Sequence, residues 1–286
     1  MPELETRRMG RTEMRPKSLG LGAAWLSRCP ESQTIEAIQR AFELGINYFD
    51  TYPGHEERRW AKALKGHRDE IYLQAKIGTH PDRRKDFSTE GARWSVENSL
   101  KELETDYLDA LLIHDPPDIE DPLRPGRALD ELLKMKEEGL IKAIGLGVRQ
   151  HEFHRRAIET GHIDLVLTHS DYHLLSQSVA QTTLPLARKH DVGIMLATVL
   201  GRFMNGTEPD GQANPQAYAM WQWCRDRGFS IRDFALQFAL AAPIDGIVVL
   251  GVANKQQVEE GYASATVHIP PEIWSDFKDE FGVGIE

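Results

Sequence analysis

The sequence predicts a (β/α)8 barrel, the TIM-barrel form of the α/β class. Short apolar segments alternate with longer helical segments from one end of the chain to the other. Strands that are apolar on both faces and alternate with helices are typical of a parallel sheet covered by helices. The chain has 286 residues, 41% of them hydrophobic, and one such barrel needs about 250 residues. No composition break marks a second domain, so we expect a single barrel over residues 1–286.

The predicted strands are eight short apolar segments. They cover residues 19–25, 47–51, 71–77, 107–114, 141–148, 164–170, 192–198 and 246–250. The predicted helices cover residues 34–43, 57–64, 90–104, 127–138, 151–159, 180–190, 215–226, 231–240 and 254–262. In the first of these helices the apolar residues recur at helical spacing, at Ile35, Ile38, Ala41 and Phe42. Eight such units in this length indicate a closed barrel rather than an open sheet.

Two irregular segments, residues 115–122 and 201–214, follow the fourth and seventh predicted strands. Loops that follow barrel strands line the mouth of the barrel, so either segment could shape a pocket or simply connect elements.

The composition excludes several classes of partner. A net charge of −10 argues against nucleic acid and against an anionic membrane surface, since both need a cationic face. No apolar run is long enough for a transmembrane helix, and the first five residues lack the pattern of a signal peptide. Cys29 and Cys224 lie far apart, outside any metal-type spacing, and both read as packing residues. We expect a cytoplasmic protein without a metal, either a monomer or a small homo-oligomer.

Three chemically active side chains end successive predicted strands. Asp50 closes the second strand, Lys76 lies in the third, and His114 ends the fourth. In a (β/α)8 barrel the chemistry takes place at the carboxyl ends of the strands. A lysine inside an apolar strand is unusual unless it is paired. An acid, an amine and an imidazole are therefore expected to meet at the barrel mouth.

Several segments, in collinear order, make the chain resemble the aldo-keto reductase family over nearly its whole length. They are residues 9–12, 19–22, 44–51, 57–64, 144–148, 249–251 and 257–260. Trp60 and Ala61 depart from the family pattern in the helix that follows the second strand. Residues 145–148 and 174–177 look most like the branch that oxidises free sugars, such as L-galactose and aldose 1-dehydrogenases.

The resemblance implies hydride transfer between a nicotinamide cofactor and a carbonyl or carbinol carbon. A tyrosine would serve as general acid and base, and its free pKa of about 10 is too high for neutral pH. The Lys76 ammonium would lower that pKa, and Asp50 would hold and balance the ammonium. His114 would orient the substrate oxygen and donate a hydrogen bond to it.

The tyrosine itself departs from the family pattern. The family usually has tyrosine five residues after the aspartate, whereas here the segment between Asp50 and Glu57 is two residues shorter. Tyr52 could enter the site on a loop tightened by the turn that follows it. His55 could replace it, since an imidazole titrates near neutral pH. As a third alternative the usual proton donor is absent, and the protein has different chemistry or none.

The resemblance also implies a set of cofactor residues. A helix N-terminus after the last strand could hold a phosphate, and a loop after the seventh strand resembles a pyrophosphate-binding loop. The implied cofactor residues are Tyr172, Thr198, Leu200, Gly201, Arg202, Gly251, Asn254, Gln257 and Glu260. Because Gln257 stands where NADP-preferring members often have a basic residue, either NAD or NADP is expected, with a lean to NAD. Gly261 replaces a common asparagine and leaves the adenine contact of Glu260 open.

Trp25, His169 and Asp171 are candidate substrate contacts, with packing as the alternative for each. The leading function is an NAD- or NADP-dependent oxidoreductase that acts on a small aldehyde, ketone or sugar lactol. One alternative is a Schiff-base lyase that uses Lys76, or less well a metal enzyme that uses Asp50, His114 and His169. Another is a reductase-like protein with redox-neutral chemistry, or with only a nucleotide-binding regulatory role.

Overall fold

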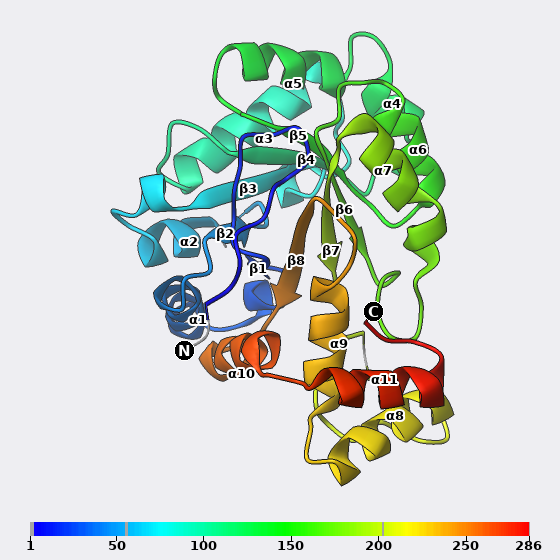
Figure 1. Cartoon of the computed structure of the whole chain (residues 1–286). Coiled ribbons are helices and arrows are strands. Elements are labelled where there is room, and N and C mark those ends of the chain that lie inside the picture. The colour runs from blue at the N-terminus through cyan, green and yellow to red at the C-terminus, as the bar shows by residue number, and fades with distance from the viewer. Residues whose placement is uncertain (1–2, 55–56, 202, 286) are drawn as a thin grey trace.

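Eight parallel strands close into a barrel in the computed structural model, which describes residues 3–54, 57–201 and 203–285 (Figure 1). Each strand pairs with the next in the sequence, and β8 pairs with β1 to close the ring. The strands are β1 Leu19–Gly22, β2 Tyr48–Asp50, β3 Tyr72–Ile77, β4 Ala110–His114, β5 Ile144–Gly147, β6 Leu165–His169, β7 Gly193–Ala197 and β8 Gly246–Gly251. The predicted fold class is confirmed.

The α-helices surround this barrel in the outer layer (Figure 1). They are α1 Glu31–Glu43, α2 Glu57–Ala63, α3 Thr89–Glu102, α4 Glu120–Leu123, α5 Ala128–Glu137, α6 His151–Ile158, α7 Thr183–His190, α8 Pro215–Asp226, α9 Ile231–Leu240, α10 Lys255–Thr266 and α11 Pro271–Phe281. Ser88 caps α3 by accepting a hydrogen bond from the Gly91 N–H, the usual role of a serine at this position.

The predicted elements differ from the structure in three places. The first strand ends at Gly22 rather than at residue 25, and a 3-10 turn, Leu26–Arg28, follows it. Residues 120–122 of the segment expected to be irregular belong to α4. Helix α11 was missed, although Pro271 suits the first helical position. Its Trp274 and Phe277 are buried against α8 and α9, where Trp223 and Phe234 complete an aromatic cluster.

Alternation along the strands separates two cores. Residues that face into the barrel, such as Tyr48, Leu112 and Met195, pack with Met9 and Met14 of the N-terminal segment. Residues on the opposite strand faces, such as Phe49 and Ile113, pack under the helices. Asp50 and Lys76 therefore belong to the inward faces, two residues beyond Tyr48 and Gln74.

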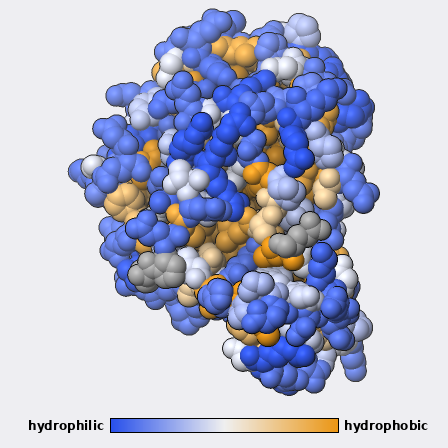
Figure 2. Space-filling model, in the orientation of Figure 1, coloured by the Kyte–Doolittle hydropathy of each residue, from blue (hydrophilic) through white to orange (hydrophobic). Residues whose placement is uncertain are grey.

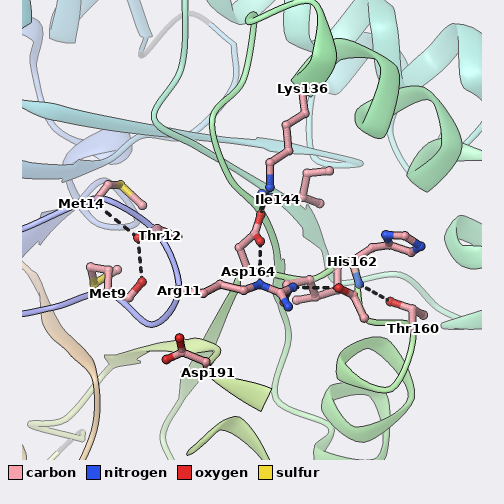
Figure 3. A network of polar contacts seen from close by, with 12 residues as sticks. Met9, Arg11, Thr12, Met14, Lys136, Ile144, Thr160, His162, Asp164 and Asp191 are labelled. Carbon is pink, nitrogen blue, oxygen red and sulfur yellow. Dashed lines mark hydrogen bonds and ion pairs between the residues drawn. The ribbon is translucent and has the colours of Figure 1, made fainter.

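The amino end of the barrel carries a network of charges that is remote from the strand ends where we expect the chemistry (Figure 3). Asp164, just before β6, accepts hydrogen bonds from the Ile144 N–H at 2.9 Å, from Arg11 Nε at 2.9 Å and from Lys136 Nζ at 2.5 Å. Asp109, just before β4, is held similarly by the Leu73 N–H and by Arg68. Asp164 thus links β5 to Arg11 of the N-terminal segment, and Asp109 links β3 to Arg68 in the 3-10 turn before it.

The face shown in Figure 2 is mostly hydrophilic, with hydrophobic residues gathered in its central hollow. A groove of about 250 Å³ lies between α7 and the segment before β8, lined by residues such as Ala187, Ile194 and Ile244. Because Ile194 is the second residue of β7 and Asp245 directly precedes β8, this groove opens near the amino ends of the strands. No helix in the described part of the chain is long and apolar enough to cross a membrane.

Candidate active site and its family

Asp50 and Lys76 form a buried ion pair at the carboxyl ends of β2 and β3. Lys76 Nζ contacts Asp50 Oδ1 and donates a second hydrogen bond to the Thr51 carbonyl at 2.6 Å. Their side chains are only 4% and 11% exposed. A buried ammonium is stable only when such partners replace water. The pair expected from the sequence is thus present in the described structure.

Two inward-facing residues that sequence reasoning missed extend this pair. Gln74 Nε2 donates to Asp50 Oδ1 at 2.5 Å, and the Tyr48 hydroxyl donates to Gln74 Oε1 at 2.7 Å. Burial and the nearby carboxylates raise the pKa of Tyr48 well above its ordinary value, so this hydroxyl stays protonated. The two-residue alternation that puts Tyr48 beside Asp50 and Gln74 beside Lys76 was the signal that could have revealed both.

His114 ends β4 and is held as a neutral imidazole. Burial, followed by the charges of Lys76, Lys85 and His169, lowers its pKa to about 3. Its Nδ1 lies 3.5 Å from Asp115 Oδ2, which is too far for a good hydrogen bond, and Nδ1 has no hydrogen-bond partner among the described residues. The ring fits because Gly147, its partner on β5, has no side chain.

Tyr52 places a phenol ring next to Lys76 and His114. Its ring centroid lies 6.2 Å from that of His114, edge to face, and Lys76 Nζ lies 5.6 Å from the Tyr52 ring centroid. Gly54 has φ +111°, a conformation that glycine adopts readily, so the chain can turn sharply after Tyr52. His55, the alternative proton donor, lies outside the described residues.

Behind the pair, Glu57 is a fully buried carboxyl group that sequence reasoning did not consider for the site. Its oxygens lie 3.1 Å from Thr51 Oγ1 and 3.0 Å from Ser99 Oγ. Burial raises its pKa from 4.5 to about 7, against the effects of Ser99, Thr51 and Lys76. A buried acid of this kind next to an ion pair is a common feature of functional sites.

The three candidate substrate residues differ in their surroundings. Trp25 is 53% exposed and lies beside Gly251, where an added Cβ would be 3.0 Å from Trp25 Cδ1. His169 ends β6, half-buried, close enough to influence the pKa of His114. Asp171 is buried, and its Oδ2 accepts hydrogen bonds from Thr168 at 2.5 Å and His151 at 2.9 Å. Trp25 thus lies beside the end of β8 and His169 at the end of β6. Asp171 is instead hydrogen-bonded to Thr168 and His151.

The residues expected to bind a cofactor lie along the carboxyl ends of β7 and β8. Thr198 and Gly201 have positive φ angles of 54° and 56° and form a turn with Leu200 directly after β7. Gly251 ends β8, and Asn254 caps α10 by accepting a hydrogen bond from the Gln257 N–H at 2.9 Å. Arg202 lies outside the described residues.

Two of the expected cofactor residues are already engaged. Gln257 folds back to accept a hydrogen bond from the Ala253 N–H at 2.8 Å. Tyr172 stacks on Phe238 with ring centroids 5.3 Å apart, so one face of its ring is covered.

Arg232, on α9, is a further residue that sequence reasoning missed. Its guanidinium donates to Glu260 at 2.7 Å, to the Asn205 carbonyl at 3.1 Å and to Ser264 at 3.1 Å. The segment after β7, α9 and α10 are thereby joined at one point. This arginine neutralises the Glu260 carboxylate. The sequence of α10 alone could not indicate this pairing, because Arg232 belongs to α9.

A model of the aldo/keto reductase family matches residues 18–279. The chain belongs to the aldo/keto reductase family. It is 27% identical to a D-threo-aldose 1-dehydrogenase of a Pseudomonas species, over 92% of this chain and 93% of that protein. It is 28% identical to L-galactose dehydrogenase of Arabidopsis thaliana, over 93% of this chain and 89% of the relative. The resemblance to this family is confirmed.

The fold agrees with this membership. The chain superposes on an aldo-keto reductase from Bacillus halodurans with a TM-score of 0.83 at 21% identity, covering 99% of this chain and 98% of that structure. This aldo-keto reductase is therefore an NAD(P)-dependent carbonyl oxidoreductase of the (β/α)8 type. Within its described residues no group of three or more histidine, cysteine, aspartate or glutamate side chains could hold a metal ion.

The residues present along β7 and β8 fit a dinucleotide. Gly251 has no side chain, Trp25 stands beside it as an aromatic surface, and Gly201 has open space where a Cβ would lie. The first N–H groups of α10 have no partners within the helix and suit an anion such as a phosphate.

Proposed function

We propose that this aldo-keto reductase oxidises a sugar lactol to its lactone, or reduces a carbonyl compound in the reverse direction, with Tyr52 as the acid/base group. The observation that carries the proposal is that the Tyr52 ring lies close to both Lys76 and His114. The sugar class is supported by the relatives named as aldose and L-galactose dehydrogenases.

Each residue of the site has a separate task in this proposal. Asp50 holds the Lys76 ammonium, and the ammonium lowers the pKa of the Tyr52 hydroxyl. Neutral His114 donates a hydrogen bond to the substrate oxygen through its ring N–H, so it does not need to become an imidazolium cation. In oxidation Tyr52, as phenolate, takes the hydroxyl proton from the carbinol. The bound NAD(P) supplies the hydride chemistry at its nicotinamide ring.

The same contacts weigh against Lys76 as a Schiff-base nucleophile. Such a lysine must lose its proton to attack a carbonyl carbon. The Asp50 carboxylate and the Thr51 carbonyl both stabilise the charged ammonium of Lys76. We therefore place Lys76 in an electrostatic role.

We infer a preference for NAD over NADP. Gln257 is neutral, and the Arg232 guanidinium is occupied by Glu260 and Asn205. Neither side chain is available to pair with a 2′-phosphate. Trp25, His169 and the turn with Thr198, Leu200 and Gly201 remain the proposed contacts to substrate and cofactor. Asp171 stays a less favoured contact, because Thr168 and His151 already engage it.

The test compares Tyr52→Phe and His55→Ala in steady-state oxidation of a panel of aldoses with NAD and NADP. We expect Tyr52→Phe to lower kcat by roughly 100-fold or more, the usual range for loss of a general acid/base. Its NADH affinity, followed by quenching of tryptophan fluorescence, should stay close to that of the parent enzyme. A large loss in His55→Ala with little change in Tyr52→Phe would transfer the acid/base role to His55.

A further inference from the structure

Glu57 is a buried carboxyl group without an ion-pair partner in the described part of the chain. It begins α2 and is fully inaccessible to solvent, and among the described residues its carboxyl oxygens have hydrogen bonds to the hydroxyls of Thr51 and Ser99. The neighbouring Arg58 points to Glu102 instead, where it donates a hydrogen bond at 2.8 Å. Burial of the ionised carboxylate with so few hydrogen-bond donors costs free energy. The neutral form of Glu57 avoids this cost.

The hydrogen bonds around Glu57 are most numerous when it carries a proton, although the Gln74 carbonyl accepts the Thr51 N–H at 2.8 Å in either state. The single hydroxyl proton of Thr51 has two acceptors in reach, Glu57 Oε1 at 3.1 Å and the Gln74 carbonyl at 2.9 Å. When Glu57 is neutral, its own O–H donates to Thr51 Oγ1, the Thr51 hydroxyl donates to Gln74, and Ser99 donates to Glu57 Oε2. When Glu57 is ionised, the Thr51 hydroxyl can serve only one of its two acceptors.

Thr51 connects this acid to the ion pair of the site. The Thr51 carbonyl accepts a hydrogen bond from Lys76 Nζ at 2.6 Å, while its hydroxyl meets Glu57. The Lys76 charge in turn favours the ionised form of Glu57 and lowers its pKa, although burial outweighs this effect. Coupling is mutual, so an ionised Glu57 must favour the ammonium form of Lys76 to the same extent.

We propose that Glu57 is a positioning residue that acts as a neutral acid and sets, through Thr51, how strongly Lys76 acts on the acid/base group. This inference rests on the proposed function, in which Lys76 lowers the pKa of Tyr52. Neutral Glu57 leaves the positive charge of Lys76 opposed by Asp50 alone. Ionised Glu57 adds a second negative charge behind Lys76, weakens its field at Tyr52 and makes the phenolate harder to form.

The other charges around Glu57 predict how its titration can be moved. Glu102, on α3, disfavours the ionised form and raises the pKa of Glu57. Lys76 on β3 is the facing cation. Toward α1, the side chains of Arg59 and Lys62 are engaged by the Cys29 carbonyl and by Glu31. Removal of the Glu102 charge should therefore lower the pKa of Glu57, and removal of the Ser99 hydroxyl should raise it.

The kinetic test measures kcat for aldose oxidation between pH 6 and pH 9 in the parent enzyme and in Glu57→Gln, whose amide imitates the neutral acid. The two rates should converge at pH 6 and separate above pH 7, where the variant becomes roughly 3- to 10-fold faster because its tyrosine ionises more easily. The pH at which the rate falls below that of Glu57→Gln should be lower for Glu102→Gln than for the parent enzyme. For Ser99→Ala this pH should be higher. A purely structural role would change the rate equally at every pH, and that result would overturn the inference.

A second measurement does not depend on turnover. The infrared C=O band of the Glu57 carboxyl group, followed against pH in the parent enzyme and in Lys76→Met, reports whether the two groups are coupled. Removal of the Lys76 charge should raise the pKa of Glu57. An unchanged titration of this band would overturn the inference even if the parent enzyme is active. A raised pKa in a protein that oxidises no sugar would leave the coupling in place and reject only the proposed function.

Discussion

The imidazole of His114 lies directly against Gly147, its partner on the neighbouring strand. A Cβ on Gly147 would come within 2.8 Å of His114 Cδ2. The absence of a side chain on β5 therefore creates the space in which the histidine of β4 is held. One strand supplies the functional group and the next supplies the room for it.

Gly147→Ala should displace His114 and lower kcat by up to roughly 100-fold, since a shift of about 1 Å in a positioned group can have this effect. The backbone of Gly147 does not require glycine, because its φ is not positive. Gly20→Ala is a control at another tight strand position, since its Cβ would lie 3.1 Å from Ile247 Cδ1 and 3.1 Å from the Tyr48 carbonyl and has no contact with His114. Equal losses of kcat in both variants would contradict the role of this contact.

Glu57 should make stability depend on pH in a predictable direction. Its pKa is about 7 in the folded protein and near 4.5 in the unfolded chain. The folded state therefore binds more protons between these values, and stability falls as pH rises from about 4.5 to 7. At about 1.4 kcal/mol per pH unit, this corresponds to about 3 kcal/mol.

Urea unfolding of the parent enzyme and Glu57→Gln at pH 4.5, 6 and 7.5 measures this difference. The glutamine variant should gain stability relative to the parent as pH rises, because it has no charge to bury. A stability difference that is the same at all three pH values would show that Glu57 does not titrate in this range.

The ion pair between Arg232 and Glu260 predicts a change in cofactor preference. Glu260→Gln should release the arginine to pair with a 2′-phosphate and improve NADPH binding relative to NADH by roughly tenfold, the value of one charge-assisted hydrogen bond. Fluorescence titration with both nucleotides measures the ratio. Glu259→Gln removes a different ion pair of α10, with Arg40, and should leave the ratio unchanged. If Glu260→Gln behaves like this control, Arg232 lies outside the nucleotide site.

Asp164 should matter for stability and not for chemistry. Asp164→Asn removes the charge that Arg11 and Lys136 share and weakens the bond to the Ile144 N–H, so we expect a loss of about 3 kcal/mol in urea unfolding. Asp245→Asn, at a half-exposed pair with Arg8, should cost less than about 1 kcal/mol. The KM for the sugar should stay the same in both variants, because Asp164 lies at the amino end of the barrel.

The local sequence pattern was sufficient to predict the barrel and three residues of the candidate site. Apolar strands alternating with amphipathic helices were enough to predict the barrel, because that alternation reflects burial on both faces of a parallel sheet. The positions of Asp50, Lys76 and His114 at strand ends followed from the same segments. The missed helix α11 and the strand that ended early at Gly22 are errors of local boundaries, where sequence signals are weakest.

The sequence by itself determined the barrel and the identity of the acid, the amine and the imidazole at its mouth. Only the tertiary structure decided which groups surround them. Gln74 on Asp50, Gly147 under His114, Glu57 behind Thr51 and Arg232 on Glu260 all join separate elements of the chain. The physical reason is that periodicity reports which face a residue occupies, whereas hydrogen bonds and charge coupling depend on distances between elements that are set only when the barrel closes.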